Sequence, residues 1–189
     1  MIRGGFGNTG FQTFYASKEK SNCPFIPELI KACKNLKEKK IVDEKSQIFI
    51  SHRYGKRVLI NSEVEDFSCI KHEELIEVID FDPFKNTLLA IGPVEPVLET
   101  PVHWMIQHAR SEVNAIIQLN DSLLADELST DYPSTKHNHS IGSIEQIKEV
   151  LKALKGSKIA IIKNHGALFV GKSLKDVEEL IIKTVGELK

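Results

Sequence analysis

The chain has 189 residues, 41% of them hydrophobic and 27% charged, which is enough for one globular domain with a substantial core. Its 25 basic and 26 acidic residues almost balance, so the net charge gives no general attraction to nucleic acids or anionic membranes. No apolar run approaches the roughly 18 residues that span a bilayer, and the cysteines form no Cys-x-x-Cys pair. We therefore expect a cytoplasmic protein with neither a membrane nor a nucleic acid as its partner.

The N-terminal segment is rich in glycine and aromatic residues and has neither helical nor strict strand periodicity. A phosphate-binding glycine loop needs a strand before the glycines and a helix directly after them, and neither pattern is present. We expect residues 1–26 to form an extended arm that docks on the domain or on a neighbouring subunit. Residues 27–189 are then expected to form the domain itself.

Local patterns in the first half of the domain predict a helix and several strands. Pro27 is typical of a helix start, and apolar residues recur at helical spacing to about Lys40. Residues 47–52 and 57–61 are expected to pair as a β-hairpin, and residues 87–91 to form another strand.

Residues 99–120 combine a helix with a buried strand. Thr100 is a favourable N-cap, so Glu99 is expected just before the helix, and residues 114–118 read as the strand. The polar stripe of this helix contains His103. The opposite face is apolar and consists of Val102, Met105, Ile106 and Ala109.

Beyond this strand, residues 121–127 are a candidate short helix and residues 129–142 a polar loop. Ser143 and Gln146 form a capping box, which predicts a helix that ends near Leu154.

The C-terminal part is predicted to contain two strands and a helix. The strands, at residues 158–162 and 167–170, flank the turn Asn164-His165-Gly166. Ser173 and Asp176 are expected to cap the last helix.

The order of these parts resembles the class II aldolase/adducin family. The resemblance consists of Glu99 before a helix, His103 four residues later, Arg110, an Asn-Ala pair that opens a buried strand, and the later His165-Gly166 turn. It covers about residues 27–189 and implies a three-layer α/β/α domain with a central, largely antiparallel sheet. It also implies a small-molecule substrate and a homo-oligomer, in particular a homotetramer.

The chain departs from the zinc site of that family. There the buried strand ends in His-x-His, which binds zinc together with the histidine of the later turn. In this chain Gln118 and Asn120 stand where the first two histidines belong, and His165 alone matches the third. The resemblance thus assigns His165 as one metal ligand and Glu99 as the catalytic base.

The chain also departs from the phosphate site of the family, whose hairpin carries Gly-Asn-x-Ser-x-Arg followed by Ile-Thr. With Ser51 and Arg53 aligned, the Gly-Asn pair falls on Ile48-Phe49 and the Thr on Asn61. A Ser-Ser pair that precedes the glutamate in many members is Val97-Leu98 here. A substrate of this chain therefore need not carry a phosphate.

A second His-x-His, at His137 and His139, lies in the polar loop. Residues two apart on an extended segment point to the same side, so both rings could face one ion. A relocated site of His137, His139 and His165, with Glu99 as base or fourth ligand, is one interpretation. The other is that the loop histidines are ordinary polar surface residues.

Two functions follow from this pattern. The first is a divergent metal-dependent lyase, with zinc as the expected divalent metal, acting on a small carbonyl or sugar-like substrate. The second is a non-catalytic protein that keeps the scaffold for binding or assembly, as in the adducin branch. His103 is expected to be structural, and Glu99 has a structural explanation too, because an acid is stabilised at any helix N-terminus. The remaining histidines are expected at the surface: His52, His72 and His108.

Overall fold

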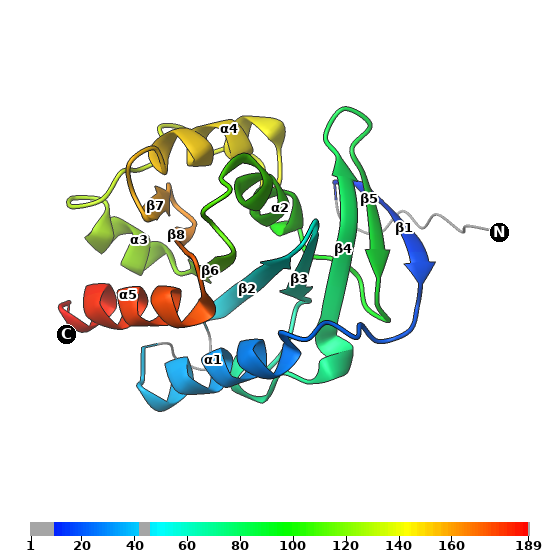
Figure 1. The fold of residues 1–189 in the computed structure, drawn as a ribbon. Coiled ribbons are helices and arrows are strands. Elements are labelled where there is room, and N and C mark those ends of the chain that lie inside the picture. Colours follow the sequence, from blue (N-terminus) through cyan, green and yellow to red (C-terminus); the bar gives the residue numbers. More distant parts are fainter. Residues whose placement is uncertain (1–9, 42–45, 189) are drawn as a thin grey trace.

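A computed structural model describes residues 10–41 and 46–188, which form one mixed sheet with helices on both faces (Figure 1). The strands of the described part are β1 (Gln12–Ser17), β2 (Gln47–Tyr54), β3 (Arg57–Asn61), β4 (Leu75–Asp82), β5 (Thr87–Ile91), β6 (Ala115–Asn120), β7 (Ile159–Ile162) and β8 (Gly166–Gly171). Their order across the sheet is β1-β5-β4-β3-β2-β6-β8-β7. Every neighbouring pair is antiparallel except β1 with β5, so the predicted largely antiparallel sheet is confirmed.

Helices cover the two faces of the sheet in pairs. The α-helices of the described part are α1 (Ile26–Glu38), α2 (Thr100–Ala109), α3 (Ser122–Leu128), α4 (Ile144–Ala153) and α5 (Leu174–Gly186). Helices α1 and α5 pack together on one face, and α2 and α4 pack together on the other (Figure 1). Two short 3-10 turns, Phe67–Cys69 and His72–Glu74, precede β4. The three-layer α/β/α architecture expected from the sequence is confirmed.

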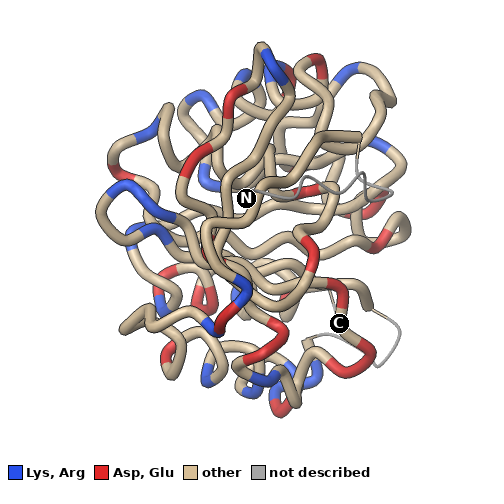
Figure 2. The backbone as a smooth tube through the Cα atoms, turned by 90° about the vertical axis from the view of Figure 1, so that its right-hand side faces the viewer, with Lys and Arg blue, Asp and Glu red and all other residues tan. Residues whose placement is uncertain are grey.

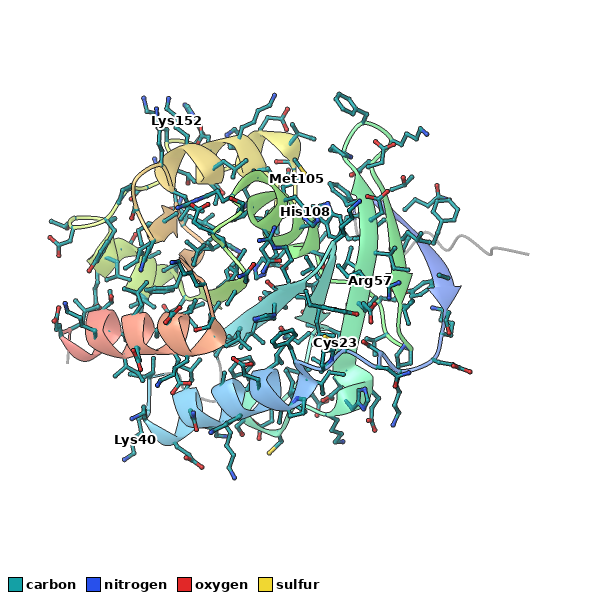
Figure 3. The ribbon with its side chains drawn as sticks, in the orientation of Figure 1. Cys23, Lys40, Arg57, Met105, His108 and Lys152 are labelled. Atoms are coloured by element: carbon teal, nitrogen blue, oxygen red, sulfur yellow. The ribbon has the colours of Figure 1, made fainter. Side chains whose placement is uncertain are left out.

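The alternation of side chains along the strands produces the core. On β2, Ile48 and Ile50 pack in the cluster beneath α1 and α5, whereas Phe49 points to the opposite face. The same period of two divides β6, where Ile117 belongs to the first cluster and Ile116 to the second. Met105 of α2 lies against both clusters of the second face and joins them (Figure 3).

The start of α2 differs from the prediction by one residue. Glu99, not Thr100, is the N-cap; its backbone is already helical, with φ −74° and ψ −16°. The Thr100 N–H donates to the carbonyl of Val97 over 3.0 Å, and its hydroxyl has no hydrogen-bond partner among the described residues. Glu99 therefore caps the helix directly, and its carboxylate contacts Asn120 on β6.

One histidine, His52, differs from expectation in its burial. His52 was predicted at the surface, but it is 5% exposed and stacks on Phe25 with ring centroids 4.0 Å apart. Its place in the middle of β2, between β3 and β6, explains the burial. His103 is fully buried, as expected of a structural residue, and Gln107 one turn later is buried too.

The predicted N-terminal arm contributes a strand to the sheet. Residues 12–17 form β1, which pairs in parallel with β5 at the sheet edge. Residues 1–9 of that predicted arm lie outside the described residues.

The serine caps of α4 and α5 are confirmed. Ser143 accepts a hydrogen bond from the Gln146 N–H over 3.2 Å, and Ser173 accepts one from the Asp176 N–H over 3.1 Å. The Gln146 side chain, however, accepts from the N–H of Gly142 and not from that of Ser143. This contact fixes the end of the polar loop against α4.

The surface carries interspersed charges of both signs, and Figure 2 shows no extended patch of one sign on the face it displays. Among the described residues, no helix is long and apolar enough to cross a membrane.

Candidate active site

Glu99 is the centre of the candidate site. The residue is 4% exposed, and its carboxylate Oε1 accepts a hydrogen bond from Asn120 Nδ2 over 2.9 Å. The residue is the N-cap of α2, at the positive end of the helix dipole. A carboxylate that is both buried and hydrogen-bonded is held in one orientation.

The amides of β6 form a chain that ends on this carboxylate. Gln118 and Asn120 are two residues apart on the strand, so both side chains project from the face that α2 covers. Gln118 Nε2 donates to Asn120 Oδ1 over 2.7 Å, and Asn120 in turn donates to Glu99. The pair therefore positions the acid through hydrogen bonds.

His165 reaches Glu99 from the turn between β7 and β8. Asn164 adopts a left-handed conformation with φ 59°, and a Cβ on Gly166 would lie 2.1 Å from the carbonyl oxygen of Leu119. The absence of a side chain at Gly166 allows the turn to press against the end of β6. As a result, His165 Nε2 lies 3.4 Å from Glu99 Oε1.

His103 supports the site from behind. Its Nδ1 lies 2.8 Å from the hydroxyl of Ser51 on β2, and Gln107 Nε2 donates to the same hydroxyl over 3.2 Å. Complete burial lowers the pKa of His103 to about 4, although Glu99 and Gln118 favour the protonated form. The imidazole is thus neutral near pH 7 and serves to position neighbouring groups.

Several buried polar atoms around Glu99 lack a hydrogen-bond partner among the described residues. They are His103 Nε2, Gln118 Oε1, His165 Nε2 and the Thr100 hydroxyl. Buried polar groups are usually paired, so water or a ligand is expected to supply bonds that the protein leaves unmade.

A cavity of about 570 Å³ opens beside Glu99. The wall of this cavity includes Phe49, Val97 and Leu98. At these positions the family pattern has phosphate-binding residues, and in this chain all three side chains are apolar. Glu63 and Glu95 also line the cavity, and its lining contains no lysine or arginine among the described residues. The wall therefore repels anions, attracts cations and imposes no such penalty on uncharged molecules.

Asn61, the other residue at a predicted phosphate position, has a structural role. Its side chain accepts from the Ile50 N–H over 2.7 Å and donates to the Ile48 carbonyl over 3.0 Å. The side chain is fully buried between β2 and β3, and its amide is used by the backbone.

The residues around Glu99 do not fit a zinc ion. Zinc sites with an open position use three imidazole, thiolate or carboxylate ligands, and this site offers the His165 imidazole and the Glu99 carboxylate. The amides of Gln118 and Asn120 are hydrogen-bonded to each other, and amides are poor zinc ligands beside imidazole.

His137 and His139 lie close to Glu149, whereas the sequence suggested His165 as their partner. The ligand atoms of His137, His139 and Glu149 all lie within 4.8 Å of one another, and His165 is not part of this group. The structure thus separates the four predicted site residues into two places: Glu99 with His165, and His137 with His139. Glu149 was missed because it lies on α4, and its sequence position gives no sign that the loop folds back onto that helix.

Comparisons with known proteins agree with this architecture. No protein-family model matches the chain, and no curated protein matches it by sequence. Among solved structures, an L-fuculose 1-phosphate aldolase superposes with a TM-score of 0.70 at 19% identity, covering 89% of this chain and 86% of that one. An L-fuculose-1-phosphate aldolase from Thermus thermophilus gives 0.60 at 15% identity, covering 86% and 91% of the two chains. The N-terminal class II aldolase domain of a Thermoplasma acidophilum protein gives 0.61 at 13% identity, covering 90% and 94%.

Proposed function

We propose that this chain, which has the class II aldolase fold, is an enzyme that moves a proton at the carbon beside the carbonyl of a small, uncharged, sugar-like substrate. The observation that carries this proposal is the buried carboxylate of Glu99, which lines a cavity of about 570 Å³ and has His165 Nε2 3.4 Å from its Oε1. The carbanion that proton removal creates can add to an aldehyde, and the reverse of this addition is the carbon–carbon cleavage of a lyase, in which the same carbanion is released and takes the proton back.

In this reaction Glu99 is the base. Its carboxylate takes the proton from the carbon, and Asn120 keeps its Oε1 oriented by the hydrogen bond of 2.9 Å. We assign His165 the role of donor to the substrate oxygen that gains charge, because its Nε2 lies 3.4 Å from Glu99 Oε1 and has no hydrogen-bond partner among the described residues.

The acidic wall of the cavity determines the class of substrate. Glu63 and Glu95 line it with Glu99, and two of the three are exposed. A phosphate ester would bring negative charge toward these carboxylates without a cationic partner, which is unfavourable in a partly buried site. Uncharged hydroxy-ketones and hydroxy-aldehydes carry no such penalty.

Deuterium exchange tests the proposal without knowledge of the natural substrate. The protein is incubated in D₂O with dihydroxyacetone, and separately with its monophosphate, and loss of the signal of the proton beside the carbonyl is followed by proton NMR. Exchange of the uncharged compound above the buffer rate supports the proposal. Exchange confined to the phosphate ester, or none across a series of uncharged hydroxy-carbonyl compounds, contradicts it.

The Gln118–Asn120 pair favours a second candidate, a non-catalytic protein that uses the scaffold for binding or assembly. Two amides bonded to each other fill the place of two metal ligands, as expected when catalysis has been lost. This candidate predicts that small uncharged ligands raise the melting temperature without any proton exchange. We also propose a homo-oligomer for both candidates, the tetramer being the expected form, which light scattering on a sizing column measures.

A further inference from the structure

The loop histidines and Glu149 form a compact group on the far side of α4 from α2. His137 Nδ1 lies 2.6 Å from Glu149 Oε1, and His139 Nε2 lies 3.4 Å from the same oxygen. The two imidazole rings are 5.7 Å apart between centroids and are tilted by 56°, so they do not stack, and the ligand atoms of all three residues lie within 4.8 Å of one another.

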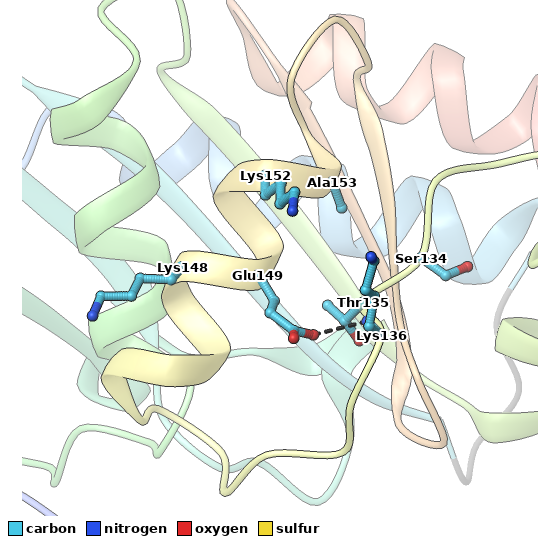
Figure 4. A pocket seen from close by; sticks show the side chains of 7 residues that line it. All are labelled: Ser134, Thr135, Lys136, Lys148, Glu149, Lys152 and Ala153. Atoms are coloured by element: carbon cyan, nitrogen blue, oxygen red, sulfur yellow. Dashed lines mark hydrogen bonds between the residues drawn. The ribbon is translucent and has the colours of Figure 1, made fainter.

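The carboxylate of this group is held in place by the backbone. Glu149 Oε2 accepts hydrogen bonds from the N–H of Lys136 over 2.8 Å and from that of His137 over 3.1 Å. The other oxygen, Oε1, is left to face both imidazoles. Figure 4 shows Glu149 reaching from α4 toward the loop at Lys136. Outer contacts of this kind orient metal ligands before the ion arrives.

The loop that carries the histidines is itself fixed. Thr135 N–H donates to the carbonyl of Ile161 over 2.8 Å, and the Thr135 hydroxyl accepts from the Lys163 N–H over 3.0 Å. The strand β7 therefore anchors the loop two residues before His137. The ligand atoms come from two elements that are both positioned by other contacts.

We propose that His137 Nδ1, His139 Nε2 and Glu149 Oε1 bind one divalent transition-metal ion of the zinc class. In a tetrahedral zinc site with bonds of about 2.0–2.1 Å, ligand atoms lie roughly 3.3 Å apart, close to the His139–Glu149 separation. The ion replaces the hydrogen bond between His137 and Glu149, so the distance between Nδ1 and Oε1 increases slightly from 2.6 Å. The His137 side chain is 69% exposed, which leaves the fourth position to water.

The surroundings select against hard cations. Lys136, Lys148 and Lys152 line a cavity of about 300 Å³ beside Glu149, and their positive charge opposes the binding of any cation. Magnesium and calcium depend on oxygen ligands and charge, and this site offers them one carboxylate. Zinc, cobalt and nickel gain instead from the two imidazole nitrogens.

This metal site is separate from the proposed activity, because its three ligands lie apart from Glu99. A bound ion would hold the loop at residues 134–143 in place. The end of this loop borders the Glu99 cavity: Ile141 lines it, and a Cβ on Gly142 would lie 2.3 Å from the carbonyl oxygen of Leu98. A bound ion would therefore stabilise the wall of the cavity from outside.

Metal binding is measured on the full chain, first stripped with a chelator, by calorimetric titration with zinc chloride and with magnesium chloride. We expect one equivalent of zinc, no magnesium, and a higher melting temperature with zinc. Glu149→Gln should weaken the affinity for zinc at least tenfold, and His137→Ala/His139→Ala should abolish zinc binding. His108→Gln, at an exposed histidine on α2, should leave it unchanged.

His165→Gln separates this site from one shared with Glu99, and we expect it to retain zinc with unaltered affinity. Loss of zinc in that variant, or binding that survives the loss of His137 and His139, would overturn the proposal. So would no binding by the folded wild-type chain, with circular dichroism confirming the fold of each variant. None of these outcomes bears on the deuterium exchange at Glu99, so the two proposals fail independently.

Discussion

Asn120 donates a hydrogen bond to Glu99 over 2.9 Å from the position to which the family pattern assigns a zinc histidine. The amide holds the carboxylate directly, where an imidazole would hold it through a metal. Gln118, two residues earlier, supports Asn120 in turn through a contact of 2.7 Å. The carboxylate of this chain is thus held by hydrogen bonds from amide side chains.

This relationship predicts that a zinc site can be restored by two substitutions. In Gln118→His/Asn120→His the new imidazoles project from the same face of β6 and join His165, which completes three nitrogen ligands. We expect the double variant to bind one zinc ion when built on a chain that carries His137→Ala/His139→Ala. Titration of that parent chain is the control, and equal zinc uptake by parent and variant would show that the three positions do not converge.

The turn that carries His165 depends on the missing side chain of Gly166. A Cβ there would lie 2.1 Å from the backbone oxygen of Leu119, so Gly166→Ala must displace the turn or β6. Overpacking of this kind typically costs about 1–3 kcal/mol of unfolding free energy. The control is Gly186→Ala in α5, where a Cβ meets nothing within 4 Å. This substitution should stabilise the helix by about 0.5–1 kcal/mol. Urea unfolding of both variants measures the difference, and equal stability of the two would contradict the contact.

His103 makes the stability of the chain depend on pH. Burial lowers its pKa from 6.5 to about 4 in the folded chain, so the unfolded chain binds more protons between these values. Through His103 the free energy of unfolding is highest above about pH 6.5. It decreases as the pH falls toward 4, by a total on the order of 3 kcal/mol. His52, whose pKa burial also lowers to about 4, acts in the same direction.

The slope of unfolding free energy against pH isolates His103 from other effects. His103→Gln should show a shallower decline between pH 6.5 and 4 than the wild type, whatever its absolute stability. His108→Gln, at an exposed position, should keep the wild-type slope. Parallel curves for His103→Gln and the wild type would mean that the buried imidazole is not the group that titrates.

The acidic wall of the cavity predicts how the chain discriminates between ligands. Glu95 is exposed and lines the cavity, so Glu95→Lys replaces a repulsive charge by an attractive one without disturbing the core. We expect the affinity for dihydroxyacetone monophosphate to rise about threefold to tenfold at low ionic strength and the gain to shrink in salt. Glu95→Gln should give a smaller gain, and no change in either variant would mean that phosphate esters bind elsewhere.

Much of the fold could be predicted because its signals are local. The Ser143 and Ser173 caps, the hairpin at β2 and β3, and the turn before Gly166 each depend on residues within a few positions of one another. The order of these parts was enough for the resemblance, and the solved structures of class II aldolases bear out the architecture.

The candidate site was less accessible to sequence reasoning because its contacts join distant segments. The polar stripe of α2 faces the sheet, since His103 and Gln107 both meet the buried Ser51 more than 50 positions earlier. Glu149 meets His137 through the fold of a loop that has no periodicity. Neither pairing leaves a mark in the spacing of residues along the chain.

The most direct test is the rate of deuterium exchange into dihydroxyacetone for the wild type, Glu99→Gln and Glu179→Gln under identical conditions; Glu179 is an exposed residue of α5 that does not line the cavity. Glu99→Gln keeps the size of the side chain and an oxygen for Asn120, but it removes the base. We predict a fall of about a hundredfold to ten-thousandfold for Glu99→Gln, with Glu179→Gln near the wild-type rate. Equal rates for the wild type and a folded Glu99→Gln would contradict the assignment of Glu99 as the base.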